Sequence, residues 1–392
     1  MSRDERLVCV TASMRAVAVG ALSVFFGVYL ERAGFDRAWI GFGIAAGLAG
    51  MAVGTLVAGM VADRVGRRRS LVVIALVMAG GAVALAVTDG VGPLMLATFV
   101  GMVNGMGRDR GAAQAVDQAV LAQVASAATR TTAFVRYTLL VDLGTAAGSL
   151  LASVTLEREA FVASLLVYAV LVGATAFGYA RMTPAVEVAA PEQKRGLSPE
   201  SRRRVAKFAA LSAVDSLGGG FITRALLAYW FVERFEVATW WMGPMFAGAS
   251  LVNATSYPVA AWTARRIGLV NTMVFTHIPS SVLLMLVPLA PNFEVAVVLF
   301  FVREFLAPMD VPTRQSYLAS IVADHERTAA AGIANLTRNA AWVVGPSLAG
   351  WAMTLSFSLP LILAGSLKIA YDLALWRAFR RIRPPEEQGA AV

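Results

Sequence analysis

Residues 59–69 read GMVADRVGRRR and form a short charged segment between two long apolar stretches, at about 38–62 and 70–88. Each stretch reaches the length of roughly 20 residues that an α-helix needs to cross a hydrocarbon core about 30 Å thick. Gly66 permits a tight turn, and three consecutive arginines hold such a loop on the cytoplasmic side of a membrane. The segment therefore predicts a membrane-embedded helical hairpin with a cytoplasmic loop.

The same alternation of apolar stretches and charged loops continues along all 392 residues. The chain is 58% hydrophobic and only 15% charged, whereas soluble domains carry about 25% charged residues. Spans of this length without strict polar and apolar alternation indicate helices rather than barrel strands. We predict an all-α polytopic membrane protein with twelve transmembrane helices, at about 8–30, 38–62, 70–88, 92–117, 131–155, 160–181, 205–231, 239–263, 269–290, 293–318, 329–354 and 358–379.

The basic residues are distributed unequally between the two sides of these spans. With both termini in the cytoplasm, the interior segments collect most of them, whereas the exterior loops collect Arg32, Arg37, Arg158 and Arg234. This asymmetry predicts the orientation, since basic flanks are retained inside. The net charge of +9 is thus a topology signal and not a sign of nucleic-acid binding. We expect a multi-pass protein of the inner (plasma) membrane.

A polar segment at 182–204 separates two similar halves. At an offset of 202 residues, Glu31-Arg32 matches Glu233-Arg234 and Gly66 matches Gly268; at an offset of 197, Gln118 matches Gln315 and Arg130 matches Arg327. Repeats of this kind are found in transporters whose substrate site lies near the midplane between the repeats. The predicted organisation is a six-helix bundle at 1–181, a basic cytoplasmic linker at 182–204 and a second bundle at 205–392.

The segment 59–69 resembles, almost position by position, the signature loop of the major facilitator superfamily. The resemblance implies twelve helices in two six-helix bundles and secondary transport by alternating access. In that family the aspartate bonds to the facing half and latches the outward-open state, a role that falls here on Asp63. Its neighbours Gly59, Arg64, Gly66 and Arg67 complete the predicted latch. The matching loop of the second half, 261–268, has no aspartate, so the latch is one-sided.

A second, looser resemblance concerns residues 345–350, which read GPSLAG. Proton antiporters of the family carry a similar Gly-Pro-rich motif on helix 5, but the counterpart here, residues 144–149, lacks the proline. Small residues at this spacing also let membrane helices pack closely. Close packing is the interpretation that we favour for both segments.

Charged residues inside membrane spans are costly and usually functional. Most of them lie on predicted helices 1, 4, 5, 7, 10 and 11, which line the central cavity in the family, while helices 3, 6, 9 and 12 are outer supports. Lys368 and Asp372 on helix 12 are four residues apart, so we expect them to pair with each other. The adjacent residues Arg303 and Glu304 are expected to face different sides of their helix.

Distance from the predicted helix ends separates the cavity charges into two sets. Near the midplane, Asp142, Asp215 and Glu304 are candidates for proton coupling, because an acid in a low-dielectric cavity changes its proton affinity as the cavity opens to either side. The candidate cytoplasmic gate residues are Arg110, Asp117, Asp310 and Arg314. The candidate substrate residues of the cavity are Asn104, Arg136, Arg303, Asn335, Arg338, Asn339 and Trp342.

These features predict a secondary transporter, working as a monomer, that couples protons to the efflux of a small amphipathic or drug-like compound. An alternative substrate is an organic anion held by Arg303 and Arg338. A different class, a membrane receptor or lipid-moving protein on the same fold, would need no titratable midplane acid. The sequence contains no phosphate-binding Gly-Lys-Ser/Thr loop and no metal-ligand cluster. We therefore expect neither cofactor nor metal, and no enzymatic activity.

Overall fold

The computed structural model describes residues 1–88, 90–107, 111–125, 130–154, 158–187, 197–322 and 326–380, and the structural statements below concern these residues. They form fifteen α-helices joined by short turns and 3-10 helices, with no strand in the described ranges. Seven helical stretches of this part are long and apolar enough to cross a membrane by themselves. The prediction of an all-α polytopic fold is confirmed.

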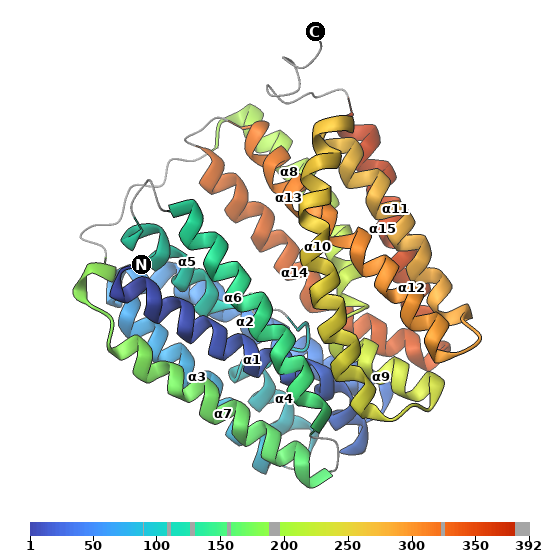
Figure 1. Ribbon diagram of the computed structural model, residues 1–392, viewed down its shortest axis with the longest axis horizontal. Helices are drawn as coiled ribbons and strands as arrows, with labels where there is room; N and C mark the ends of the chain where they lie inside the picture. Colours follow the sequence, from blue (N-terminus) through green and yellow to red (C-terminus); the bar gives the residue numbers. More distant parts are fainter. Residues whose placement is uncertain are drawn as a thin grey trace. The chain divides into compact units, whose positions relative to one another are not determined.

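The chain divides into two compact units, which Figure 1 colours along the sequence. The first comprises residues 1–192 and 223–250, and the second comprises residues 193–222 and 251–392. The first contains α1 (Arg3–Arg32), α2 (Arg37–Val65), α3 (Arg67–Val87), α4 (Val91–Val100), α5 (Ala112–Val124), α6 (Arg130–Leu151), α7 (Arg158–Ala180), α9 (Arg224–Phe235) and the start of α10 (Met242–Ile267). The second contains α8 (Pro199–Gly220), the rest of α10, α11 (Leu269–Leu286), α12 (Phe293–Leu306), α13 (Asp310–Ser320), α14 (Arg327–Leu355) and α15 (Leu359–Phe379).

Three of the twelve predicted spans are broken into two helices each. The span at 92–117 becomes α4 and α5, the span at 205–231 becomes α8 and α9, and the span at 293–318 becomes α12 and α13. The first break has a clear cause: Met102 and Gly107 adopt positive φ angles of 50° and 81°. The Asn104 side chain accepts a hydrogen bond from the Met106 amide at 2.8 Å. Pro308, in the 3-10 turn Ala307–Met309, marks the third break.

Glycines bring helix backbones into direct contact inside each unit. A Cβ at Gly148 of α6 would lie 2.0 Å from the Val17 carbonyl oxygen of α1, and one at Gly345 of α14 would lie 2.5 Å from the Gly220 Cα of α8. Both glycines belong to the small-residue segments noted in the sequence. Their contacts agree with close helix packing as the role of these segments.

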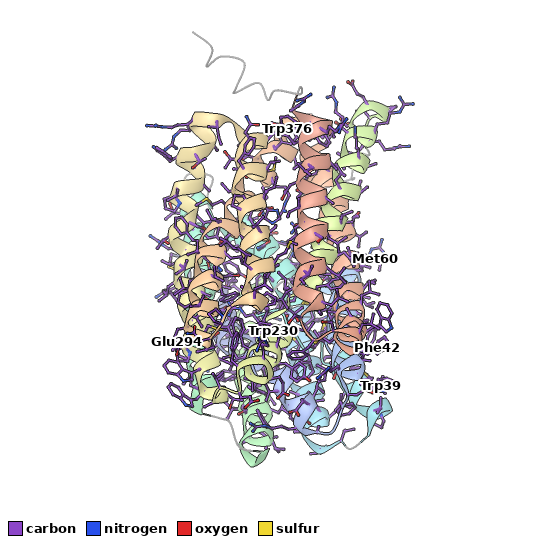
Figure 2. The ribbon with its side chains drawn as sticks, turned by 90° about the vertical axis from the view of Figure 1, so that its right-hand side faces the viewer. Trp39, Phe42, Met60, Trp230, Glu294 and Trp376 are labelled. Atoms are coloured by element: carbon purple, nitrogen blue, oxygen red, sulfur yellow. The ribbon has the colours of Figure 1, made fainter. Side chains whose placement is uncertain are left out.

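The outward surface of the bundle is apolar. On α2, Trp39, Phe42 and Met60 are exposed, and Figure 2 labels all three along this helix. Apolar side chains also cover the outer faces of α3 and α7, which pack against each other. A soluble monomer rarely exposes patches of this extent, whereas lipid tails solvate them. The surface is therefore that of a membrane-embedded protein.

Candidate functional site

Asp215 is the centre of a buried charge cluster in the second unit. Its carboxylate accepts hydrogen bonds from Lys368 Nζ of α15 at 2.7 Å and from Arg314 Nη1 of α13 at 3.3 Å. All three residues are less than one-tenth exposed. Buried charges need partners of opposite sign, and here one acid of α8 holds two cations from two other helices. Asp215 was predicted as a functional acid, but the sequence did not reveal its partners.

Lys368 and Asp372 do not pair with each other, so that prediction is wrong. Lys368 turns to Asp215, whereas both Asp372 oxygens lie 3.0–3.1 Å from Nδ1 of His277 on α11. Four residues advance about 40° beyond a full helical turn. The two side chains of α15 therefore face different neighbours, α8 and α11. Charges on a predicted outer helix are a signal in the sequence, but their spacing of four residues indicates an internal pair.

The sequence predicts that Asp215 lies near the midplane, apart from the gate candidates Asp310 and Arg314. In the structure these three residues lie together. Asp310 accepts a hydrogen bond from Arg314 Nη1 at 2.5 Å, and the same nitrogen reaches Asp215. The 3-10 turn Ala307–Met309 interrupts the predicted span before α13, so counting residues from the start of the span does not predict how its charges are grouped. Asp215, Asp310 and Arg314 belong to one cluster.

Arg303 and Glu304 form a direct ion pair on α12, contrary to the expectation that adjacent side chains diverge. The flexible arginine stem allows its guanidinium to fold over the neighbouring carboxylate. Glu304 also accepts a hydrogen bond from the Asn253 amide of α10 at 3.0 Å. Glu304 is therefore held by two partners, and Arg303 already has an acid beside it.

The polar residues of α14 share one helix face, as the spacing 335, 338, 339 and 342 predicts. Asn335 is exposed, Asn339 is half-buried and Trp342 is buried. The Arg338 guanidinium lies 5.0 Å from the Trp342 ring centroid and donates through Nε to Ser216 Oγ of α8 at 3.1 Å. Arg338 has no carboxylate within ion-pairing distance among the described residues.

The first unit contains a separate buried pair. Arg15 of α1 donates from Nη2 to Asp117 Oδ2 of α5 at 2.7 Å, with exposures of 1% and 0%. Tyr179 of α7 completes the group: its hydroxyl accepts from Arg15 Nη1 and donates to Asp117 Oδ2 at 3.3 Å. Asp117, a predicted gate residue, thus joins three helices of one unit. Tyr179 was not identified from the sequence.

The remaining cavity and coupling candidates of the first unit lie apart from this group. Asp142 is half-buried on α6, with no ion pair to any described residue. Arg136 is exposed on the same helix and lines a hollow with Glu5. Asn104 is buried and shapes the turn between α4 and α5. Arg110 lies outside the described residues.

In the signature loop, Asp63 and Arg67 form an exposed ion pair at 2.8 Å, across the junction of α2 and α3. Gly66 has a φ of +110°, which agrees with the predicted tight turn. Arg64 is exposed, and a Cβ at Gly59 would stand in open space beside its own helix. The latch contact of Asp63 with a facing half stays a prediction.

The sequence did not reveal that Glu187 holds this loop. Its carboxylate accepts hydrogen bonds from the backbone amides of Arg67 at 2.6 Å and Arg68 at 3.3 Å. These amides are free at the start of α3, where the helix dipole favours a negative charge. The Gln123 amide of α5 binds the Glu187 carbonyl at 2.7 Å. The beginning of the predicted linker is therefore fastened to the loop and to α5.

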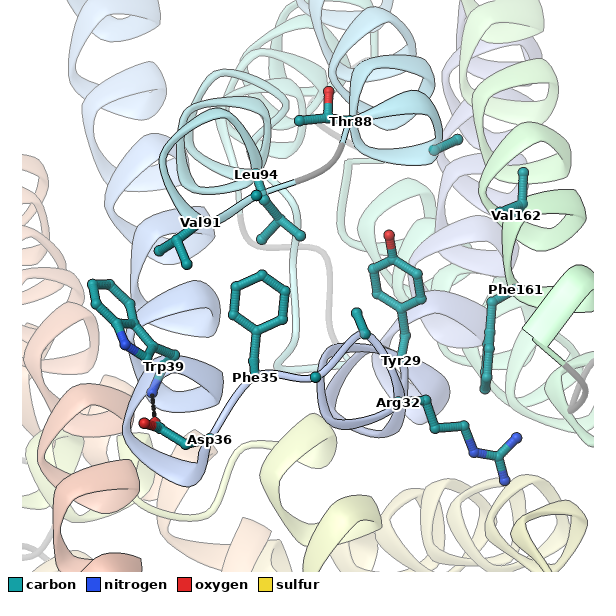
Figure 3. A pocket seen from close by; sticks show the side chains of 14 residues that line it. Tyr29, Arg32, Phe35, Asp36, Trp39, Thr88, Val91, Leu94, Phe161 and Val162 are labelled. Carbon is teal, nitrogen blue, oxygen red and sulfur yellow. Dashed lines mark hydrogen bonds between the residues drawn. The ribbon is translucent and has the colours of Figure 1, made fainter.

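A cavity of about 400 Å³ lies at the opposite ends of these helices, where α1 leads into α2 and α3 into α4. Tyr29, Phe35 and Leu94 surround it in Figure 3, and Asp36 accepts a hydrogen bond from the Trp39 amide at 2.9 Å. Its lining includes none of the residues predicted for the substrate cavity. Among the described residues, no group of three His, Cys, Asp or Glu side chains is placed to hold a metal ion.

Comparison with known proteins places this fold among membrane transporters. A family model described as Major Facilitator Superfamily matches residues 8–278 and 209–391. Uncharacterized membrane protein YJR124C of Saccharomyces cerevisiae is 24% identical over 95% of this chain and 93% of its own length.

Solved structures with the same fold share little sequence with the chain. The nucleoside transporter NupG has a TM-score of 0.78 at 13% identity, covering 97% of this chain and all of its own. A POT family transporter in complex with 5-aminolevulinic acid has a TM-score of 0.80 at 12% identity, with 97% of both chains covered. A bacterial homolog of the human lysosomal transporter Spinster, inward-facing and occupied, gives 0.76 at 10% identity, with 96% of both chains covered. At this identity the likeness concerns the fold.

Proposed function

Because the chain belongs to the Major Facilitator Superfamily, we propose that it is a proton-coupled secondary transporter that exports a small amphipathic solute by alternating access. In this mechanism the two predicted halves, 1–181 and 205–392, rock against each other. The protein works in the inner membrane with both termini in the cytoplasm, and it acts as a monomer antiporter. No nucleic acid takes part.

The observation that carries the proposal is the buried cluster around Asp215. Three carboxylates and several cations of α8, α11, α13 and α15 lie together inside a membrane protein. Such a group is expensive to bury, and intramembrane charges of this kind mark ion or proton pathways. A purely structural core would be served as well by apolar packing. The cluster therefore supports proton coupling over passive transport.

The experiment that tests this function begins with a thermal-shift screen of detergent-solubilised protein against drugs, organic acids and sugars. A ligand that binds only the folded state raises the unfolding temperature. Proteoliposomes are then loaded with the stabilising compound and given an imposed pH gradient. We expect flux that follows the gradient and stops when a protonophore collapses it. Flux that is indifferent to the gradient would contradict proton coupling.

A second candidate substrate, an organic anion, is favoured by the surroundings of Arg338. A guanidinium in a membrane interior keeps its charge and needs an acceptor. Arg338 has only Ser216 and the Trp342 ring in the described part of its unit. An anionic ligand would supply the missing counter-charge. Arg303 is a weaker candidate, since Glu304 already neutralises it.

We expect Arg338→Lys to weaken the binding of an anionic ligand by roughly tenfold or more, because lysine cannot offer the planar pair of donors. Arg303→Lys is expected to weaken it less. Binding is measured as the thermal shift against ligand concentration. If Arg338→Lys keeps normal affinity and a double Arg303→Gln/Glu304→Gln variant rescues transport lost in the singles, both arginines are structural and the anion site is wrong.

For the signature loop, we expect Asp63→Asn to leave the protein inserted and folded but to shift its resting population towards inward-open. The neutral amide loses the charge on which the predicted latch depends. In a Cys9→Ser background, labelling of single cysteines in the exterior vestibule should fall. Arg69→Gln changes a charge in the same loop and serves as the control. Unchanged labelling in Asp63→Asn, or an equal fall in both variants, would remove the latch assignment.

A further inference from the structure

We infer that His277 and Asp372 form a proton-binding site whose occupancy controls the contact between Asp215 and Arg314. The inference rests on the proposed proton-coupled transport and adds the group that receives the proton. His277 was not among the proton-coupling candidates predicted from the sequence. The site lies on α11 and α15, two helices that the resemblance assigns to outer support.

The imidazole of His277 lies between two acids. Its Nδ1 is 3.0 Å from Asp372 Oδ2, and its Nε2 is 3.7 Å from Asp215 Oδ1. A neutral imidazole has one donor and one acceptor. When Nδ1 donates to Asp372, a neutral ring presents a lone pair to the Asp215 carboxylate, so two acceptors face each other. Only a ring that carries protons on both nitrogens can donate to both acids.

Among the charged groups of the cluster, the proton on His277 Nε2 is the one that can be gained and lost. With a neutral His277, the ion-paired cluster holds three carboxylates, of Asp215, Asp310 and Asp372, and two cations, Arg314 and Lys368. One proton taken up from water at Nε2 therefore makes the buried group neutral, and its release leaves one net negative charge. His277 itself contacts Asp215 on α8 and Tyr371 and Asp372 on α15. The charged groups around these are Arg314 and Lys368, which bind Asp215; Asp310, which binds Arg314; Arg338, which binds Ser216; and the pair Arg303 and Glu304 on α12.

A protonated His277 and Arg314 of α13 compete for the carboxylate of Asp215. Asp215 Oδ1 already accepts from Lys368 at 2.7 Å, and Oδ2 accepts from Arg314 at the longer distance of 3.3 Å. A protonated His277 draws Asp215 towards α11. The Arg314 contact is the weaker of the two and is lost first, since Arg314 keeps Asp310 of its own helix at 2.5 Å.

We expect α13 to be the element that moves in this competition. It has eleven residues, and the turn at Ala307–Met309 separates it from α12. Arg314 is its charged connection to α8, so protonation of His277 releases that connection. A proton bound on α11 is thereby converted into a change in the position of a short helix that carries two predicted gate residues.

The first experiment observes the proton directly. The sequence has two histidines, His277 and His325, so His325→Gln leaves one ring to observe in protein purified with a histidine-free tag. After ¹⁵N-histidine labelling and reconstitution, solid-state NMR reads both ring nitrogens from acid to alkaline pH. We expect two protonated nitrogens at acid pH and a single Nδ1–H tautomer at alkaline pH. One unchanging neutral tautomer over the whole range would overturn the inference.

The second experiment observes α13. In a Cys9→Ser background, spin labels at Ala206→Cys and Ser316→Cys, exposed positions on α8 and α13, report the distance between the helices. We expect the distance distribution to change with pH, and the change to vanish in His277→Gln. The matched control is Asn271→Ala, which removes the hydrogen bond from Trp376 to Asn271, another side-chain bond between α11 and α15.

The control should keep the pH response. If Asn271→Ala abolishes it as fully as His277→Gln, the pair only holds the two helices together and the inference is wrong. Neither experiment uses a transported ligand. A titrating His277 without pH-driven flux in proteoliposomes would therefore contradict the proposed function alone, and pH-driven flux with a silent His277 would contradict this inference alone.

Discussion

Replacement of Arg15 by methionine is expected to lower the free energy of unfolding by about 3–5 kcal/mol, the cost of removing one partner of a buried ion pair. The carboxylate concerned is Asp117, which is fully buried and 2.7 Å from Arg15 Nη2. Tyr179 donates to the same oxygen from 3.3 Å, but a hydroxyl does not neutralise a charge. The loss should appear as a lower midpoint of reversible unfolding in mixed micelles.

Two further variants separate charge from packing. Arg204→Met makes the same substitution in the exposed pair of Arg204 with Glu200 on α8 and should change stability little. The double variant Arg15→Met/Asp117→Leu removes both charges and should recover most of the stability lost in Arg15→Met. A double variant as unstable as the single one would mean that the shapes of these side chains, and not their charges, join α1 to α5 and α7.

This pair and the Asp215 cluster are related through the sequence repeat. The offset of 197 that matches Gln118 with Gln315 also matches Asp117 with Arg314, since 117 plus 197 is 314. In each half, an ion pair joins the first predicted span to the fourth, as Arg15 with Asp117 and Asp215 with Arg314. The signs are exchanged between the halves. Both fourth spans are broken, so in each half the pair fastens the short helix that follows the break.

The helices could be predicted from the sequence because a bilayer requires an uninterrupted apolar run of fixed length. The breaks could not. Gly105 and Gly107 lie at the first break, but glycines also occur inside unbroken spans, for example Gly43 and Gly47 of α2. Only the positive φ angles of Met102 and Gly107 distinguish them. A break depends on what surrounds the backbone, which periodicity does not contain.

The sequence predicts which charged residues lie inside the membrane spans, but not which residues they pair with. The cost of burying a charge singles out Asp215, Glu304 and Arg338 wherever the helices pack. Which cation meets Asp215 depends on how α15 and α13 pack against α8, which is a tertiary property. Local spacing suggested Lys368 with Asp372, but spacing favours only what an isolated helix would do. The role of His277 could not be predicted, because a single histidine on a predicted outer helix carries no local signal.

The last prediction concerns the three acids proposed for proton coupling. We expect at least one of Asp142→Asn, Asp215→Asn and Glu304→Gln to abolish flux driven by an imposed pH gradient while exchange of substrate survives. Exchange needs alternating access but no net proton movement, so the comparison isolates coupling from folding and binding. Glu294→Gln, at an exposed acid at the start of α12, is the matched control and should keep both activities.

The surroundings of each acid give its variant a distinct expected behaviour. Asp215→Asn leaves Lys368 and Arg314 with one carboxylate fewer, so it should also reduce stability, and Asp215→Asn/Lys368→Met should recover part of that loss. Glu304→Gln keeps an amide that can still bond to Asn253. Asp142 has no ion pair with any described residue, so its variant should fold normally and gives the cleanest measurement of coupling. Full pH-driven flux in all three variants would exclude these acids as the path of the coupled proton.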